Sequence, residues 1–162
     1  MEANMLQKID SIDLANYILY KYGSMSHLKL QKLLFYCDAY HLAYFDEELI
    51  TDKFEAWVHG PVSKKVFDSL KDKSILYADL RFSGDEKQVQ QKYLNLTIDQ
   101  RVLIDEILSV LSTWSGLQLE TSTHNEKPWQ EARYGLSAGD RCDKEISKET
   151  TKLFYKLELG LS

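Results

Sequence analysis

The sequence predicts a mainly α-helical fold: a compact helical domain around one long central helix, with a small antiparallel β element. Three observations lead to this prediction. Apolar residues recur every three or four positions through most of the chain, as they do on the buried face of a helix. Capping residues precede several of these stretches, and strand-like sequence is confined to short pieces. Because no repeat or linker divides the chain, we expect one domain over residues 1–162.

Two helices are expected in the N-terminal part of the chain. Asp10 or Ser11 can cap the first helix, which should end at Gly23. Ser26 can cap a second and longer helix over residues 28–45, whose leucines gather on one side. The length and apolar character of this second helix make it the expected centre of the domain.

The middle of the chain mixes strand and helix signals. Residues 49–58 break into short strand-like pieces. Pro61 is expected to be the first residue of the next helix, because its fixed φ suits that position and its missing N–H leaves nothing unpaired there. Gly60 supplies the permissive backbone before it. Residues 75–82 alternate like a strand, and residues 87–96 are read as a second strand that returns beside it.

The C-terminal part is expected to be helical. A Thr-x-x-Gln capping box predicts a helix over residues 97–114, and Gly116 should end or bend it. Residues 117–124 form a further helix, and Pro128 opens another helical turn. The last helix is expected over residues 147–157.

Composition limits the functions that the protein can have. The net charge of −5 at pH 7 argues against a broad phosphate-binding surface, so direct binding of nucleic acid is not expected. No stretch approaches the roughly 18 apolar residues of a membrane span. The two cysteines, Cys37 and Cys142, are too few for a disulfide framework or a four-cysteine zinc site. We therefore expect a soluble, cytoplasmic protein without a cofactor or metal, in which Cys37 is a buried free thiol.

Enzyme motifs are absent from the sequence. The histidines are scattered without metal-binding spacing, and neither a GxSxG nucleophile motif nor a glycine-rich nucleotide loop occurs. The protein is therefore not expected to be an enzyme. One alternative stays open: a small hydrolase or transferase in which His59 and His124 act as acid and base with a carboxylate such as Glu55 or Asp38.

Three segments of the sequence resemble a known family. KLQKLL at residues 29–34, AWVHGPV at 56–62 and THNEKPW at 123–129 are similar, in this order, to the signature segments of the SocA-like Panacea domain of phage-associated and genetic-element proteins. The resemblance implies a mainly helical domain with a small β element, and it implies the function of an antitoxin. Some relatives carry an added DNA-binding helix-turn-helix domain, for which this chain has no room.

The resemblance also implies the partner. Antitoxins of this family neutralise a cognate protein toxin that is encoded by the adjacent gene, and we expect neutralisation by direct stoichiometric binding. The alternative, which SocA itself suggests, is an adaptor that delivers the toxin to a cellular protease. The oligomeric state stays open.

Candidate partner-binding residues come from the signature segments and from the tyrosines of the long helix, because Trp and Tyr are frequent at interfaces. They are Tyr36, Tyr40, Trp57, His59, Gly60, Pro61, Val62, His124, Pro128 and Trp129. We expect Trp57, His59 and the segment 123–129 to converge around the turn at Gly60 and Pro61. The competing interpretation gives these residues only a packing role at helix starts.

Overall fold

The computed structural model describes residues 5–71 and 76–162, and within these ranges the fold is mainly α-helical, as predicted. The helices are α1 (Ser11–Tyr22), α2 (His27–Phe45), α3 (Lys64–Leu70), α4 (Glu86–Leu94), α5 (Ile98–Leu111), α6 (Gly116–His124), α7 (Lys127–Ala132) and α8 (Lys148–Glu158). The strands are β1 (Met25–Ser26), β2 (Phe54–Trp57), β3 (Gly60–Ser63) and β4 (Asp79–Leu80).

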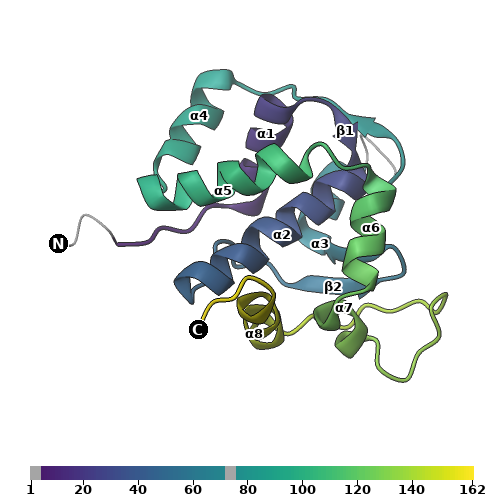
Figure 1. Ribbon diagram of the computed structural model, residues 1–162. Coiled ribbons are helices and arrows are strands. Elements are labelled where there is room, and N and C mark those ends of the chain that lie inside the picture. The colour runs from purple at the N-terminus through teal and green to yellow at the C-terminus, as the bar shows by residue number, and fades with distance from the viewer. Residues whose placement is uncertain (1–4, 72–75) are drawn as a thin grey trace.

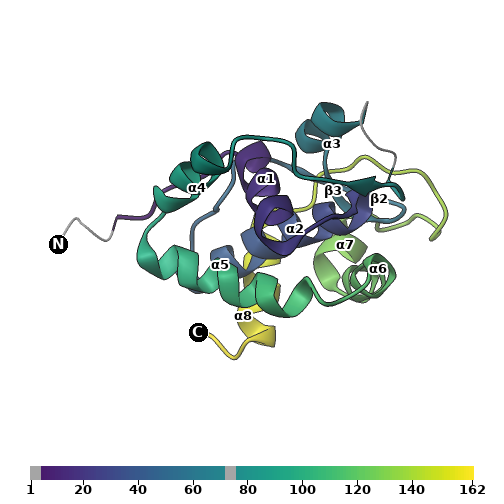
Figure 2. The ribbon, with the colours of Figure 1, turned by 90° about the horizontal axis from the view of Figure 1, so that it is seen from above.

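Helix α2 lies at the centre of the molecule, in contact with α1, α5, α6 and α8 (Figure 1, and Figure 2 from above). Its predicted cap is confirmed, because Ser26 Oγ accepts a hydrogen bond from Lys29 N at 3.1 Å. Leu33, Leu34 and Cys37 have no exposed surface, as expected for a central helix. Although α2 is the longest helix, no helix in the described ranges combines the length and hydropathy needed to cross a membrane.

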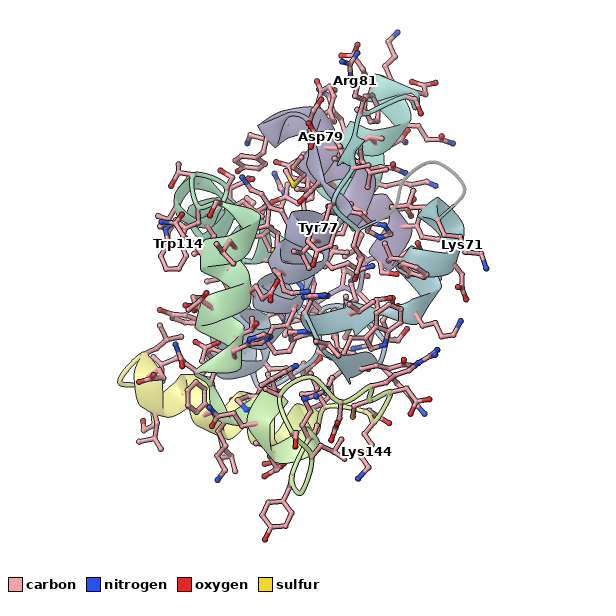
Figure 3. All side chains as sticks on the ribbon, turned by 90° about the vertical axis from the view of Figure 1, so that its right-hand side faces the viewer. Lys71, Tyr77, Asp79, Arg81, Trp114 and Lys144 are labelled. Carbon is pink, nitrogen blue, oxygen red and sulfur yellow. The ribbon has the colours of Figure 1, made fainter. Side chains whose placement is uncertain are left out.

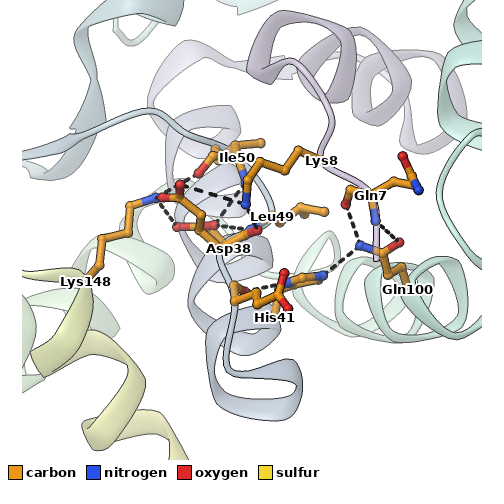
Figure 4. Close-up of polar contacts among 10 residues, drawn as sticks. Gln7, Lys8, Asp38, His41, Leu49, Ile50, Gln100 and Lys148 are labelled. Carbon is orange, nitrogen blue, oxygen red and sulfur yellow. Dashed lines mark hydrogen bonds and ion pairs between the residues drawn. The ribbon is translucent and has the colours of Figure 1, made fainter. Parts of the chain in front are cut away.

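A buried carboxylate on α2 holds the chain that follows this helix (Figure 4). Asp38 accepts hydrogen bonds from the backbone N–H groups of Leu49 and Ile50, at 2.8 and 3.2 Å. Its other oxygen pairs with Lys148 Nζ of α8 at 2.9 Å. A buried charge must be paired and hydrogen-bonded, and here these bonds fix the loop after α2 and the start of α8.

His41, one turn further along α2, joins this helix to α5 (Figure 4). Gln100 Oε1 accepts from the N–H groups of Gln7 and Thr97 at 3.1 and 3.0 Å, so its amide nitrogen must donate to His41 Nε2, 2.9 Å away. His41 Nδ1 therefore carries the proton and donates to Glu47 O at 2.6 Å. Burial lowers the pKa of His41, in keeping with a neutral ring.

The β element consists of two small antiparallel pairs. Strands β2 and β3 form a hairpin with Trp57 opposite Gly60 at its turn. Residues 144–146 pair with the other edge of β2, where Ile146 N donates to Phe54 O at 2.7 Å. Strands β1 and β4 form the second pair. The hairpin thus lies between α2 and a late segment of the chain, which brings sequence-distant residues together.

The prediction that Pro61 begins a helix is wrong. Pro61 lies in β3, and α3 begins only at Lys64, where Ser63 Oγ accepts a hydrogen bond from Val66 N at 3.2 Å as the helix cap. Pairing with β2 and hydrogen bonds from α2 favour the extended conformation over the local preference of proline. The missing N–H of Pro61 does no harm in a short strand whose edge is closed by side chains.

The predicted strand pair over residues 75–96 is also corrected. Only Asp79 and Leu80 are in a strand, which pairs with β1, and residue 75 lies outside the described residues. The segment after it forms α4, because its two buried residues, Val89 and Tyr93, lie four positions apart on one helical face. Asp85 caps this helix by accepting from Lys87 N at 2.9 Å.

The C-terminal helices follow the predictions with two shifts. The Thr97 and Gln100 capping box is present, but α5 ends at Leu111. Gly116 begins α6 rather than ending α5, because Ser115 caps α6. Pro128 lies in the first turn of α7, as predicted. Helix α8 also forms as predicted.

Candidate functional site

The three signature segments meet at the hairpin β2–β3, and we call this region the signature junction. On one side, Trp129 Nε1 of α7 donates to Trp57 O at 2.8 Å. One turn later, Arg133 Nη1 donates to Ala56 O at 2.9 Å. The side chain of Trp129 is buried, with 8 % of its surface exposed. The segment 123–129 therefore holds the hairpin through the backbone of β2.

On the other side, α2 holds the hairpin through β3. Gln31 forms two hydrogen bonds with the backbone of Ser63: its Oε1 accepts from Ser63 N at 2.8 Å and its Nε2 donates to Ser63 O at 3.2 Å. Lys32 Nζ donates to Pro61 O at 2.9 Å. These bonds close the outer edge of β3, which would otherwise present unpaired backbone groups. Gln31 and Lys32, the polar pair inside KLQKLL, therefore supply hydrogen bonds to the backbone groups at the edge of β3.

Gly60 allows this close approach. Its φ is +110°, a backbone conformation that residues other than glycine rarely adopt. A β-carbon at this position would overlap Cε of Lys32 and lie 2.9 Å from Thr123 Oγ1. Gly60 is therefore required both by its backbone conformation and by the packing of α2 and α6 against it.

Lys32 is the least expected residue of the junction, since its side chain is fully buried. Burial lowers the pKa of this amine to about 7, and the charge of Glu120 acts in the opposite direction. A lysine has three donors, and Pro61 O is the one hydrogen-bond acceptor that Lys32 has among the described residues. Neither Lys32 nor Glu120 was among the sequence candidates. The sequence feature that could have pointed to Lys32 is its place on the leucine-rich side of a central helix, because lysines are rarely buried without a specific partner.

His59 lies at the exposed tip of the hairpin. Its Nδ1 is 3.2 Å from Glu120 Oε2, and its Nε2 is 3.0 Å from the hydroxyl of Tyr77. The side chain of His59 is 40% exposed, against 16% for Glu120. Figure 3 shows Tyr77 near the middle of the face that is turned toward the viewer. His59 thus links the hairpin to α6 and to the segment before β4.

His124 lies deeper in the same region. Its ring stacks on Trp129, with 4.1 Å between the ring centroids. Burial lowers the pKa of His124, although the charge of Glu120 and a hydrogen bond with the Val58 backbone oppose this shift. Its Nε2 is buried and has no hydrogen-bond partner among the described residues. The two histidines therefore have different surroundings, one at the surface and one stacked inside.

A pocket of about 440 Å³ lies beside the hairpin. It is lined by Glu55, Trp57, Val58, His59, Lys64, Arg141, Cys142 and Asp143. Glu55 accepts a hydrogen bond from Trp57 Nε1 at 2.8 Å. Of the residues named for the enzyme alternative, the structure brings His59 and Glu55 to this pocket. His124 does not line it, and Asp38 is bonded elsewhere. Within the described ranges, no group of three or more acidic, His or Cys side chains could hold a metal ion.

The remaining candidates divide between core and surface. Val62 and Pro128 are buried. Tyr36 is also buried, and its hydroxyl donates to Glu126 Oε1 at 2.7 Å, beside Tyr155, whose hydroxyl reaches the same oxygen at 2.6 Å. Burial raises the pKa of Glu126, and the two tyrosine hydrogen bonds oppose the rise. The two tyrosines and Glu126 form a packing centre between α2, α7 and α8.

Tyr40, in contrast, is half-buried. Its ring packs on Tyr155 at 5.5 Å between centroids, but its hydroxyl has no hydrogen-bond partner in the described part of the chain. Of the two tyrosine candidates, Tyr40 is therefore the one that can reach a partner.

These features define a class of protein: a mainly helical domain whose central helix holds a small hairpin by buried polar side chains. The family model "Antitoxin SocA-like, Panacea domain" matches residues 30–130, which is more than half of the chain, and the protein belongs to this family. The resemblance drawn from the three segments is thereby confirmed. No curated protein and no solved structure gave a significant match.

The tryptophans provide a test of the junction. Trp129→Ala is expected to lower the free energy of unfolding by about 3 kcal/mol, because it removes a buried ring and the hydrogen bond to Trp57 O. Trp57→Ala should lower it by only about 1 kcal/mol, since this ring is half-buried and the carbonyl of Trp57 remains. Trp114→Ala, at a position that is 37% exposed, is the control. Urea denaturation measures all three variants, and a larger loss for Trp57→Ala than for Trp129→Ala would contradict this account.

Proposed function

We propose that this protein is an antitoxin that neutralises a protein toxin, encoded by the adjacent gene, by direct stoichiometric binding and without chemistry of its own. Membership of the antitoxin SocA-like family supports a toxin as the partner. The observation that carries the proposed mechanism is the set of hydrogen bonds that the signature side chains form. Gln31, Lys32 and Trp129 all form hydrogen bonds with the backbone of one hairpin.

Such an arrangement favours a rigid binding scaffold. These three side chains are buried against the backbone of the hairpin and do not face solvent, whereas a catalytic group must reach the reacting atoms. A surface fixed in advance loses little conformational entropy on binding. The signature residues therefore support binding indirectly, by keeping the elements around them in one geometry.

One observation favours a second candidate function. The pocket beside the hairpin holds His59 and Glu55, which is the minimum for acid–base chemistry in a small hydrolase or transferase. In this alternative His59 would be the acid–base group. The binding proposal treats the same residue as a structural link between Glu120 and Tyr77.

A titration distinguishes these functions. Purified antitoxin is added to a fixed amount of the active product of the adjacent gene, and the remaining toxin activity is measured. Inhibition that saturates near equal amounts is the expected result. Inactivation of a large excess of toxin by a trace of this protein would contradict the proposal and favour an enzyme. Binding that inhibits only when a cellular protease is supplied would favour the adaptor mechanism.

Histidine variants extend this test. His59→Gln and His124→Gln keep hydrogen-bonding capacity but remove acid–base titration near neutral pH, so both are expected to neutralise the toxin like the wild type. Melting temperatures establish first that each variant folds. Folded variants that have lost neutralisation while they still bind the toxin would show that a histidine does chemistry.

A further inference from the structure

Large apolar side chains are exposed on α2, α5 and α8, among them Tyr44, Val110 and Leu157. In Figure 3, Trp114 and the C-terminal end of α8 lie on the same side of the molecule. Between α2 and α5 the surface is hollowed into a groove of about 280 Å³. We call it the α2–α5 groove; its main lining residues are Tyr40, Tyr44, Leu103, Glu106, Ile107 and Val110. Tyr44 is 47% exposed and Val110 is 57% exposed. Exposed apolar surface of this kind marks interaction sites.

The tyrosines of the groove have unused hydrogen-bonding capacity. The hydroxyls of Tyr40 and Tyr44 have no hydrogen-bond partner among residues 5–71 and 76–162. Tyr36 and Tyr155, which pack against Tyr40, both bind Glu126. An amphipathic ring with a free hydroxyl in a concave apolar site is typical of an interface hot spot.

The border of the groove is acidic. Glu106 lines it, and the charge of Glu158 on α8 contributes, after burial, Glu126 and Tyr44, to a raised pKa of Tyr40. Both Glu106 and Glu158 are exposed, and neither forms an ion pair with any described residue. A nearby lysine, Lys156, is already paired with Asp46 at 2.9 Å. Among the described residues, the groove is therefore lined by one unpaired carboxylate and no cation, with the unpaired Glu158 acting on the same tyrosine.

These features select one kind of occupant. An apolar groove along a helix accepts the apolar face of another helix, and the part of α5 that lines the groove, from Leu103 to Leu111, provides about 12 Å of length for it. Acidic borders require basic residues on the flanks of that helix. A second copy of this chain is disfavoured, because it would bring its own Glu106 and Glu158 to an acidic border.

We propose that the α2–α5 groove binds an amphipathic helix of the cognate toxin. Tyr40, Tyr44 and Val110 would contact the apolar face of the toxin helix, and Glu106 and Glu158 would face Lys or Arg residues on its flanks. This inference rests on the proposed function, since it names the surface that the toxin occupies. The signature junction then has a defined task. It fixes the N-terminal half of α2, while the C-terminal half of the same helix presents the tyrosines.

The test uses the purified full chain and the product of the adjacent gene, with affinity measured by biolayer interferometry. Val110→Glu is expected to weaken binding by at least about 30-fold, as the loss of a hot spot does. Val102→Glu is the matched control, because Val102 lies on the same helix and is 53% exposed but does not line the groove. It should change the affinity by less than about threefold. Tyr44→Ala provides a second groove variant with no added charge, and melting temperatures verify that all variants fold.

The charge assignment has its own readout. In the double variant Glu106→Gln and Glu158→Gln, association should slow and become less sensitive to salt, because opposite charges at an interface accelerate encounter. Unchanged salt dependence of the association rate would overturn the assignment of basic flanks.

The outcomes separate the two proposals. If the wild-type chain does not bind the product of the adjacent gene at all, the proposed function fails and this inference fails with it. If the wild type binds and Val110→Glu and Tyr44→Ala bind equally well, the groove proposal is wrong while the antitoxin proposal stands. If Val110→Glu converts a dimer of this chain to a monomer and still binds the toxin, the groove is a self-interface and the proposal is overturned.

Discussion

Gly60→Ala is expected to destabilise the protein by about 4 kcal/mol. Two effects combine. The φ of +110° is strained for alanine, which costs roughly 1–3 kcal/mol. The added methyl group overlaps Lys32 Cε and crowds Thr123 Oγ1, and overpacking of a rigid core costs roughly 1–3 kcal/mol more. Lys32 cannot move aside easily, because its side chain is fully buried and bonded to Pro61 O.

A matched glycine separates strain from crowding. Gly23 has a similar φ of +92°, but no atom lies within 4 Å of the position that its β-carbon would take. Gly23→Ala is therefore expected to cost only about 1–2 kcal/mol from the backbone alone. Urea denaturation of both variants gives the two values. Equal losses at Gly60 and Gly23 would show that the contact between α2 and the hairpin tip is looser than described.

The second large effect concerns Lys32 and pH. The pKa of about 7 in the folded protein lies below the ordinary value of 10.5. Between these values the unfolded chain binds more protons than the folded one, so this residue makes stability rise as pH rises. From well below pH 7 to well above pH 10.5 the titration of Lys32 raises the free energy of unfolding by about 5 kcal/mol in total. Below pH 7 both states bind the proton, and the full cost of burying the charge remains.

Lys32→Met tests this directly. Methionine keeps the apolar stem but removes the amine, so the variant loses one hydrogen bond to Pro61 O and no longer buries a charge. At pH 6 it is expected to be more stable than the wild type by about 2 kcal/mol. At pH 9 this advantage should be gone, because the wild type has gained about 3 kcal/mol relative to the variant.

The measurement is urea denaturation of both proteins at pH 6, 7, 8 and 9. Lys87→Met, which removes an exposed amine on α4, is the control for the loss of one positive charge. A difference between wild type and Lys32→Met that is constant across this range would contradict a titrating lysine in the core. Such a result would mean that water or a carboxylate reaches the amine and keeps it charged.

Local signals predicted the helices well. Caps at Ser26 and Thr97, and apolar spacing of three to four residues, depend only on neighbours in the chain, and the structure confirms them. The same reasoning was wrong where pairing between distant segments decided the conformation. Pro61 has a local preference for a helix start, but β2 and Lys32 hold it in a strand. The segment predicted to return as a strand over residues 87–96 instead forms α4, because Val89 and Tyr93 are buried on one face of a helix.

For the site, the sequence by itself determined the class of protein and the segments that matter. Three short signatures identified an antitoxin family and pointed to a convergence around Gly60. Only the tertiary structure showed how they converge: through Gln31, Lys32 and Trp129, each of which bonds to the backbone of the hairpin. It also separated Tyr36, which is bound in the core, from Tyr40, which lines a groove with an acidic border. The physical reason is that burial and hydrogen-bond partners depend on contacts between distant segments, whereas helix caps and apolar periodicity depend only on residues that are close in the chain.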